Sequence, residues 1–168
     1  MQKLVSEFMG TFLLVFLGSG AVLLAKGDAL TIALGFGLAI TVSAYAFGGI
    51  SGGHFNPAVT TAMVINGRTP ALEGVCYVIA QIIGAIAASA CVRVATSALK
   101  LPASQMAQTD FPKISVGAAF FVEALVTFLF LMVILAVTAD RFGNANFAGL
   151  TIGVTFALLI LFALNLPG

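Results

Sequence analysis

Five apolar segments, each long enough to cross a lipid bilayer, constrain this chain more than any other feature. They lie at about 4–25, 29–48, 71–95, 115–138 and 147–166. An α-helix needs roughly 20 residues to cross a hydrocarbon core about 30 Å thick, and each segment is close to that length. The first segment superficially resembles a signal peptide, but because further spans follow, we interpret it as a retained helix.

The composition excludes a soluble domain. Of the 168 residues, 61% are hydrophobic and only 8% are charged, and the mean hydropathy is +1.16. About a quarter of a soluble domain is normally charged. The net charge is +1, without any run of basic residues, so nothing favours binding to nucleic acid. We predict an all-α polytopic membrane protein, a helical bundle that forms one membrane domain over residues 1–168.

An internal repeat organises the spans. Glu7 and Glu123 both begin the pattern E-x-x-x-T-F inside an apolar segment, and they are 116 residues apart. The same offset relates Gly37 to Gly153. The pattern predicts a first repeat over 1–108, with three spans and a half-helix, and an incomplete second repeat over 109–168, with two spans. A repeat with three spans places its successor upside down in the membrane, as in the inverted repeats of many transporters.

A shorter apolar segment lies between the second and third spans. Asn56 is a favoured helix N-cap and Pro57 suits the first helical position, so a helix is predicted over about 57–66. It is too short to span, and its glycine-rich entry at Gly52 and Gly53 favours a sharp bend. Such re-entrant backbone is tolerated at membrane depth only inside protein or beside a wet cavity. The helix N-terminus would then face a solute path and disfavour cations.

The ten residues S-G-G-H-F-N-P-A-V-T at 51–60 resemble the first signature of the aquaporin family, and the resemblance covers the whole chain. It implies that Asn56, Pro57 and Ala58 lie at the pore. It also implies that the backbone of the preceding loop lines the pore, over Gly52, Gly53, His54 and Phe55. His54 is the only histidine, and no metal-ligand cluster accompanies it, so we expect a packed side chain and no metal.

The resemblance also implies a selectivity constriction. Its second-span position falls on Phe36, where water-selective members commonly carry Phe and glycerol-conducting members Trp. Its fifth-span position falls on Ile160, where water-selective members often carry His. The apolar Ile160 keeps glycerol and other small neutral solutes open as substrates beside water.

Two acids, Glu7 and Glu123, lie inside apolar segments, where ionisable groups are costly and usually functional. They could reach water from near the helix ends. The resemblance instead implies that each accepts hydrogen bonds from the backbone of a half-helix loop, although the loop served by Glu123 would belong to the second repeat. In that repeat the second signature would fall at 172–174, beyond Gly168. We therefore expect a fragment or a truncated product with five of the six family spans, incomplete as a selective channel by itself.

Three functions remain open from the sequence. The first is a passive channel that conducts water, and with it other small neutral solutes, and that excludes protons and ions. The second is a glycerol facilitator, and the third is a non-conducting structural subunit of a membrane assembly. An enzyme is not expected, because the apolar segments hold no paired catalytic groups, and no cofactor is implied. The resemblance implies a homotetramer in the plasma (inner) membrane of the cell, whereas the distribution of Lys and Arg does not decide the orientation.

Overall fold

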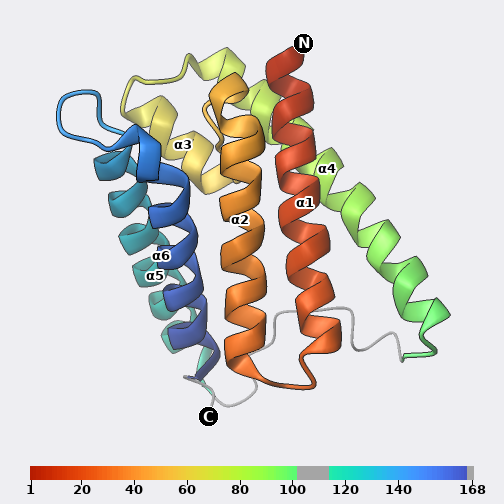
Figure 1. Ribbon diagram of the computed structural model, residues 1–168. Helices are drawn as coiled ribbons and strands as arrows, with labels where there is room; N and C mark the ends of the chain where they lie inside the picture. Colours follow the sequence, from red (N-terminus) through yellow and green to blue (C-terminus); the bar gives the residue numbers. More distant parts are fainter. Residues whose placement is uncertain (102–113, 166–168) are drawn as a thin grey trace.

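A computed structural model describes residues 1–101 and 114–165, and these residues form six α-helices (Figure 1). The helices are α1 (Gln2–Leu24), α2 (Ala29–Ser51), α3 (Pro57–Ile65), α4 (Ala71–Ala98), α5 (Val116–Val137) and α6 (Ala145–Asn165). Five of them are long and apolar enough to cross a membrane. The sixth, α3, has only 9 residues. The predicted membrane fold with five spans and one half-helix is confirmed.

The helices form an inverted arrangement. In Figure 1, α1 runs from the top of the bundle to the bottom, whereas α5 runs from the bottom to the top. The next helix of each set, α2 and α6, also run in opposite directions and pack side by side. Helix α1 packs against α2 and α4, and α3 lies in the upper half against α4 and α5. The predicted boundary at residue 108 lies outside the described residues.

The two halves meet where α2 crosses α6. A Cβ atom added to Gly37 would lie 2.6 Å from the carbonyl oxygen of Gly153, and one added to Gly153 would lie 2.6 Å from the carbonyl oxygen of Gly37. Only glycine allows two helix backbones to approach this closely, as at many helix contacts in membranes. The two positions that the repeat makes equivalent are therefore in direct contact.

A second close crossing joins α1 to α4. Ala80, Gly84 and Ala88 form a stripe of small residues on α4, a pattern that predicts a close helix contact. A Cβ atom added to Gly84 would lie 2.5 Å from the carbonyl oxygen of Phe8. Ala88, one turn further along, is fully buried. The stripe thus packs α4 against α1 within one chain.

Two details differ from the sequence-based expectation. Helix α2 continues past residue 48 to Ser51 and ends at Gly52, whose φ of +96° gives the left-handed cap that glycine favours. The apolar segment at 71–95 predicts that its two cysteines, Cys76 and Cys91, pack in the core, but Cys91 is exposed and Cys76 is half-buried. The prediction failed because an apolar residue of a membrane helix can face lipid as readily as protein.

Candidate functional site: the half-helix α3 and its polar support

The start of α3 is fixed by its own sequence. The Asn56 backbone is extended, and its side-chain oxygen accepts a hydrogen bond of 2.7 Å from the amide of Ala58. Pro57 occupies the first helical position, where its missing N–H costs nothing. The helix N-terminus, with its partial positive charge, therefore stands at Asn56.

The loop that leads into α3 is tightly bent. Gly52, Gly53 and Phe55 all have positive φ angles, of +96°, +69° and +49°. Such a conformation costs a non-glycine residue about 1–2 kcal/mol, so Phe55 must be held in place. Its ring is buried and packs on Gly10, where an added Cβ would lie 2.1 Å from a ring carbon.

Glu7 supports this loop from α1. Its carboxylate is fully buried and accepts hydrogen bonds from the backbone amides of His54 (3.0 Å) and Phe55 (2.7 Å). It also accepts hydrogen bonds from the Ser51 hydroxyl (2.6 Å) and from the Gln81 side-chain amide (2.8 Å). A buried carboxylate is tolerable only with such partners. Glu7 therefore joins α1, the loop and α4 at one point.

Thr60 extends the same cluster from within α3. Its hydroxyl accepts a hydrogen bond from the Gln81 amide (2.9 Å) and lies 3.1 Å from Nδ1 of His54. The buried His54 ring also meets the edge of Tyr77, whose hydroxyl donates to the backbone oxygen of Ser51 at 2.8 Å. Side chains from α3, α4 and the loop thus fix the half-helix in the bundle.

Two cavities border α3 and the loop before it. The larger, of about 280 Å³, is lined by Asn56, Ala58, Glu123 and Ile160 among others. The smaller, of about 20 Å³, is lined in part by Gly52, Gly53 and His54. Val59 and Phe130 border both cavities. The cavities are therefore neighbours, and residues of α3, α5 and α6 line both of them.

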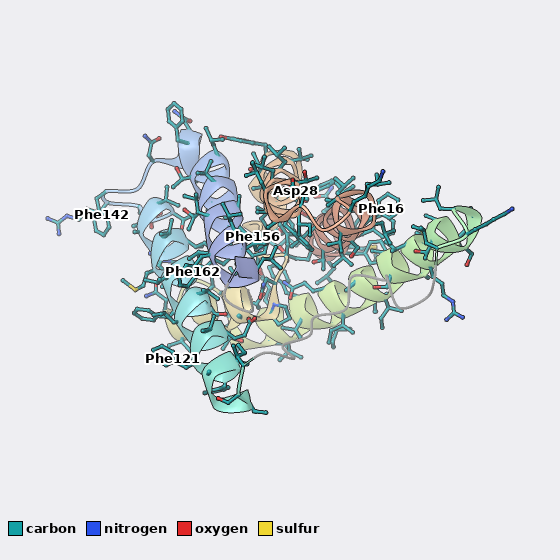
Figure 2. All side chains as sticks on the ribbon, turned by 90° about the horizontal axis from the view of Figure 1, so that it is seen from below. Phe16, Asp28, Phe121, Phe142, Phe156 and Phe162 are labelled. Atoms are coloured by element: carbon teal, nitrogen blue, oxygen red, sulfur yellow. The ribbon has the colours of Figure 1, made fainter. Side chains whose placement is uncertain are left out.

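The remaining predicted site residues are placed differently. The side chain of Phe55 packs inward on Gly10, and Pro57 is exposed. Phe36 is half-buried and packs on Gly18, and its ring meets the edge of Phe156 at 6.3 Å. In Figure 2, Phe156 points from α6 toward the middle of the bundle, whereas Phe121 and Phe142 point outward. Phe36 therefore contacts α6 one turn before Ile160.

Sequence reasoning missed most of the polar support. Ser51 and Thr60 lie within the signature at 51–60, and Tyr77 and Gln81 lie in the apolar segment at 71–95. All four are polar residues in or beside apolar segments, and all four are buried. A buried polar residue in a membrane helix usually has a specific partner, and this signal could have identified them. In residues 1–101 and 114–165, no group of three or more His, Cys, Asp or Glu side chains could hold a metal ion.

Comparison with known proteins agrees with this architecture. The family described as "Major intrinsic protein" matches residues 1–168. "Glycerol uptake facilitator protein-like 6" of Lactiplantibacillus plantarum is 70% identical over 168 residues, which cover all of this chain and 78% of that protein. "Aquaporin Z" of Brucella melitensis is 38% identical over 179 residues, covering 99% of this chain and 77% of the relative.

A solved structure shares the fold. The aquaglyceroporin from Plasmodium falciparum superposes with a TM-score of 0.81 at 29% sequence identity, over 98% of this chain and 72% of that one. The match of the family over the full chain and the shared fold lead to one conclusion. The chain belongs to the major intrinsic protein family, whose members are membrane channels and not enzymes.

Proposed function

We propose that this protein provides a passive path for water and other small uncharged solutes, running between the two repeats past the N-terminus of α3. The observation that supports this most is the position of Asn56, the cap of α3, on the larger of two neighbouring cavities. The loop residues Gly52, Gly53 and His54, on the wall of the smaller cavity, continue the path.

The chemistry of Asn56 suits a neutral solute that forms hydrogen bonds. Its side-chain oxygen is already bonded to the amide of Ala58, so the side-chain NH₂ group remains to donate to a passing solute. The unpaired amides of the helix N-terminus add partial positive charge at the same place. A cation, including a hydrated proton, would be repelled there, whereas a neutral molecule would not.

Water is the first candidate solute. Phe36 occupies the position at which the family resemblance associates Phe with water-selective members. The smaller cavity of about 20 Å³ supports the same choice, because a single water needs roughly 10–15 Å³.

Glycerol is the second candidate, and two observations favour it. Ile160, on the wall of the larger cavity, is apolar, and an apolar wall can pack against the carbon chain of a polyol. The relative that is 70% identical is described as a glycerol uptake facilitator-like protein.

Glu123 lines the larger cavity, and we assign it the role in the second repeat that Glu7 has in the first. We further propose a homotetramer in the plasma membrane.

Stopped-flow light scattering of proteoliposomes tests the proposal. Under a sucrose gradient, vesicles with the protein should shrink faster than protein-free vesicles, and under a glycerol gradient a conducting protein should also speed the re-swelling. Shrinkage at equal rates with and without the protein would favour a non-conducting structural subunit. Fast shrinkage without faster re-swelling would restrict the path to water.

A variant pair tests the role of Asn56. Asn56→Ser keeps an oxygen for the helix cap but replaces the two N–H donors by a single O–H on a shorter side chain, so the water permeability should fall severalfold. Asn66→Ser is the matched control, because Asn66 is the exposed C-cap of the same helix. Equal permeabilities of the two variants would argue against a path past Asn56.

A further inference from the structure

The C-terminal end of α3 is rigidly connected to Arg68. Gly67 has a φ of +75°, and the amides of Arg68 and Thr69 both donate to the backbone oxygen of Met63, at 2.9 and 3.3 Å. These bonds close the helix in the manner of a glycine-based C-cap. The backbone of Arg68 therefore moves with α3.

The side chain of Arg68 binds the opposite repeat. Its guanidinium donates to the hydroxyl of Thr138 at 3.0 Å and to the backbone oxygen of Leu135 at 3.2 Å, both at the C-terminal end of α5. The Thr138 hydroxyl in turn donates to the backbone oxygen of Ile134 at 2.6 Å. The last carbonyl groups of a helix are unpaired and partly negative, so a cation binds well there.

The same helices enclose the smaller cavity. Met63 of α3, Ile134 of α5 and Thr138 all lie on its wall. Beneath the Arg68 contact, α3 and α5 are joined by an apolar cluster that includes Met63, Val59, Phe130 and Ile134. A cavity of about 20 Å³ holds one water at most, so a small change in the spacing of α3 and α5 changes what can pass.

We propose that Arg68 is a positioning residue that ties α3 to α5 across the repeat boundary and thereby sets the width of the solute path at its narrow end. This inference rests on the proposed function for its effect on solutes. The tie itself is a matter of geometry and can be measured without any transport.

The first experiment measures the tie directly. Nitroxide labels at Ile65 and Asp140, both exposed, are placed in a background in which Cys76 and Cys91 are replaced by Ala. Double electron–electron resonance then gives the distance distribution between the ends of α3 and α5 in the reconstituted protein. Arg68→Ala should broaden the distribution and shift it to longer distances. An unchanged distribution would overturn the proposal.

Matched variants separate the tie from a general loss of charge. Arg141→Ala removes an arginine just beyond the end of α5. In the described part of the chain, Arg141 makes no hydrogen bond or ion pair. It should leave the distribution as in the wild type, and an equal broadening would overturn the proposal. Thr138→Val should broaden the distribution less than Arg68→Ala, because Leu135 still accepts one bond. Thr138→Ser should restore the wild-type distribution.

The second experiment measures the effect on solutes. In proteoliposomes, Arg68→Ala should raise the ratio of glycerol to water permeability severalfold, and Thr138→Ser should not. A changed distance between the labels with an unchanged permeability ratio would overturn the role of Arg68 in setting the width of the path.

If the wild type conducts neither solute, the proposed function fails, and the distance measurement still decides whether Arg68 ties the repeats. If Arg68→Ala does not fold, Thr138→Val serves for both measurements.

Discussion

Gly37 and Gly153 touch each other at the crossing of α2 and α6, each lying against the carbonyl oxygen of the other. The contact is reciprocal, with 2.6 Å in both directions for an added Cβ. A reciprocal contact between equivalent positions is what a twofold axis through the crossing requires. The inverted repeat is therefore visible in the packing of two residues that carry no side chain.

The first prediction concerns this crossing. Gly37→Ala places a methyl group against the Gly153 carbonyl and the Ala157 side chain, both 2.6 Å away, and overpacking of this kind costs about 1–3 kcal/mol. The melting temperature in detergent, followed by circular dichroism, should fall. Gly20→Ala is the control, because an added Cβ at Gly20 meets nothing within 4 Å. It should leave the melting temperature unchanged or raise it, and equal melting temperatures for both variants would contradict the prediction.

The second prediction concerns the buried acid on α1. Glu7→Gln replaces one acceptor oxygen by an NH₂ group that faces donors, so at least one backbone or side-chain donor loses its partner. Leaving a buried donor without its acceptor costs about 1–3 kcal/mol. Amide hydrogen exchange of His54 and Phe55 should therefore speed up strongly, and the protein should melt at lower temperature.

Glu73→Gln is the control for this variant. Glu73 forms a partly exposed ion pair with Lys3 at 2.9 Å, and such pairs contribute about 0–1 kcal/mol. Hydrogen exchange in the loop should not change. Similar effects of the two glutamine variants would show that Glu7 is not the main support of the loop.

The third prediction compares two adjacent threonines of α3. Both hydroxyls bond to the backbone oxygen four residues earlier, but only Thr60 also meets His54 and Gln81. Thr60→Val should cost about 1–3 kcal/mol because it leaves the Gln81 amide short of an acceptor. Thr61→Val removes an exposed hydroxyl and should change stability little. Thermal unfolding of both variants, measured side by side, checks the difference.

The fourth prediction concerns the turn between α1 and α2. Hydrogen bonds from the Thr31 hydroxyl and amide hold the pKa of the Asp28 carboxyl below its ordinary value of 3.8. A lowered pKa in the folded state means that the ionised cap stabilises the protein above pH 3.8 and that this contribution is lost as the pH falls through the lowered pKa. Asp28→Asn keeps an acceptor but does not titrate. The melting temperature of the wild type should therefore drop more between pH 5 and pH 2 than that of Asp28→Asn.

The sequence alone gives the spans and the start of α3. Apolar length determines the number of crossings, and Asn56 followed by Pro57 is a local signal that needs no tertiary contact. The predicted helix at 57–66 agrees with the observed Pro57–Ile65 to within one residue. The repeat was also visible, because Glu7 and Glu123 carry the same short pattern.

The contacts between helices were harder to predict. The bonds of Arg68 to Thr138 and Leu135 join residues about 70 positions apart, and no local pattern indicates which helix end an exposed arginine reaches. The partnership of Thr60 with Gln81 likewise depends on how α3 lies against α4. Such contacts follow from helix crossing angles, which depend on the packing of many side chains.

The hydrogen bonds around Glu7 also limit when the half-helix can reach its final position during membrane insertion. The loop before α3 exposes amides that lipid cannot satisfy, and their acceptor comes from α1, while the Gln81 amide on α4 completes the cluster. Residues 52–65 are synthesised before α4, so at that stage the acceptor is present but one wall of the site is absent. The re-entrant segment therefore has its full set of hydrogen-bond partners only after the third span has joined the first two.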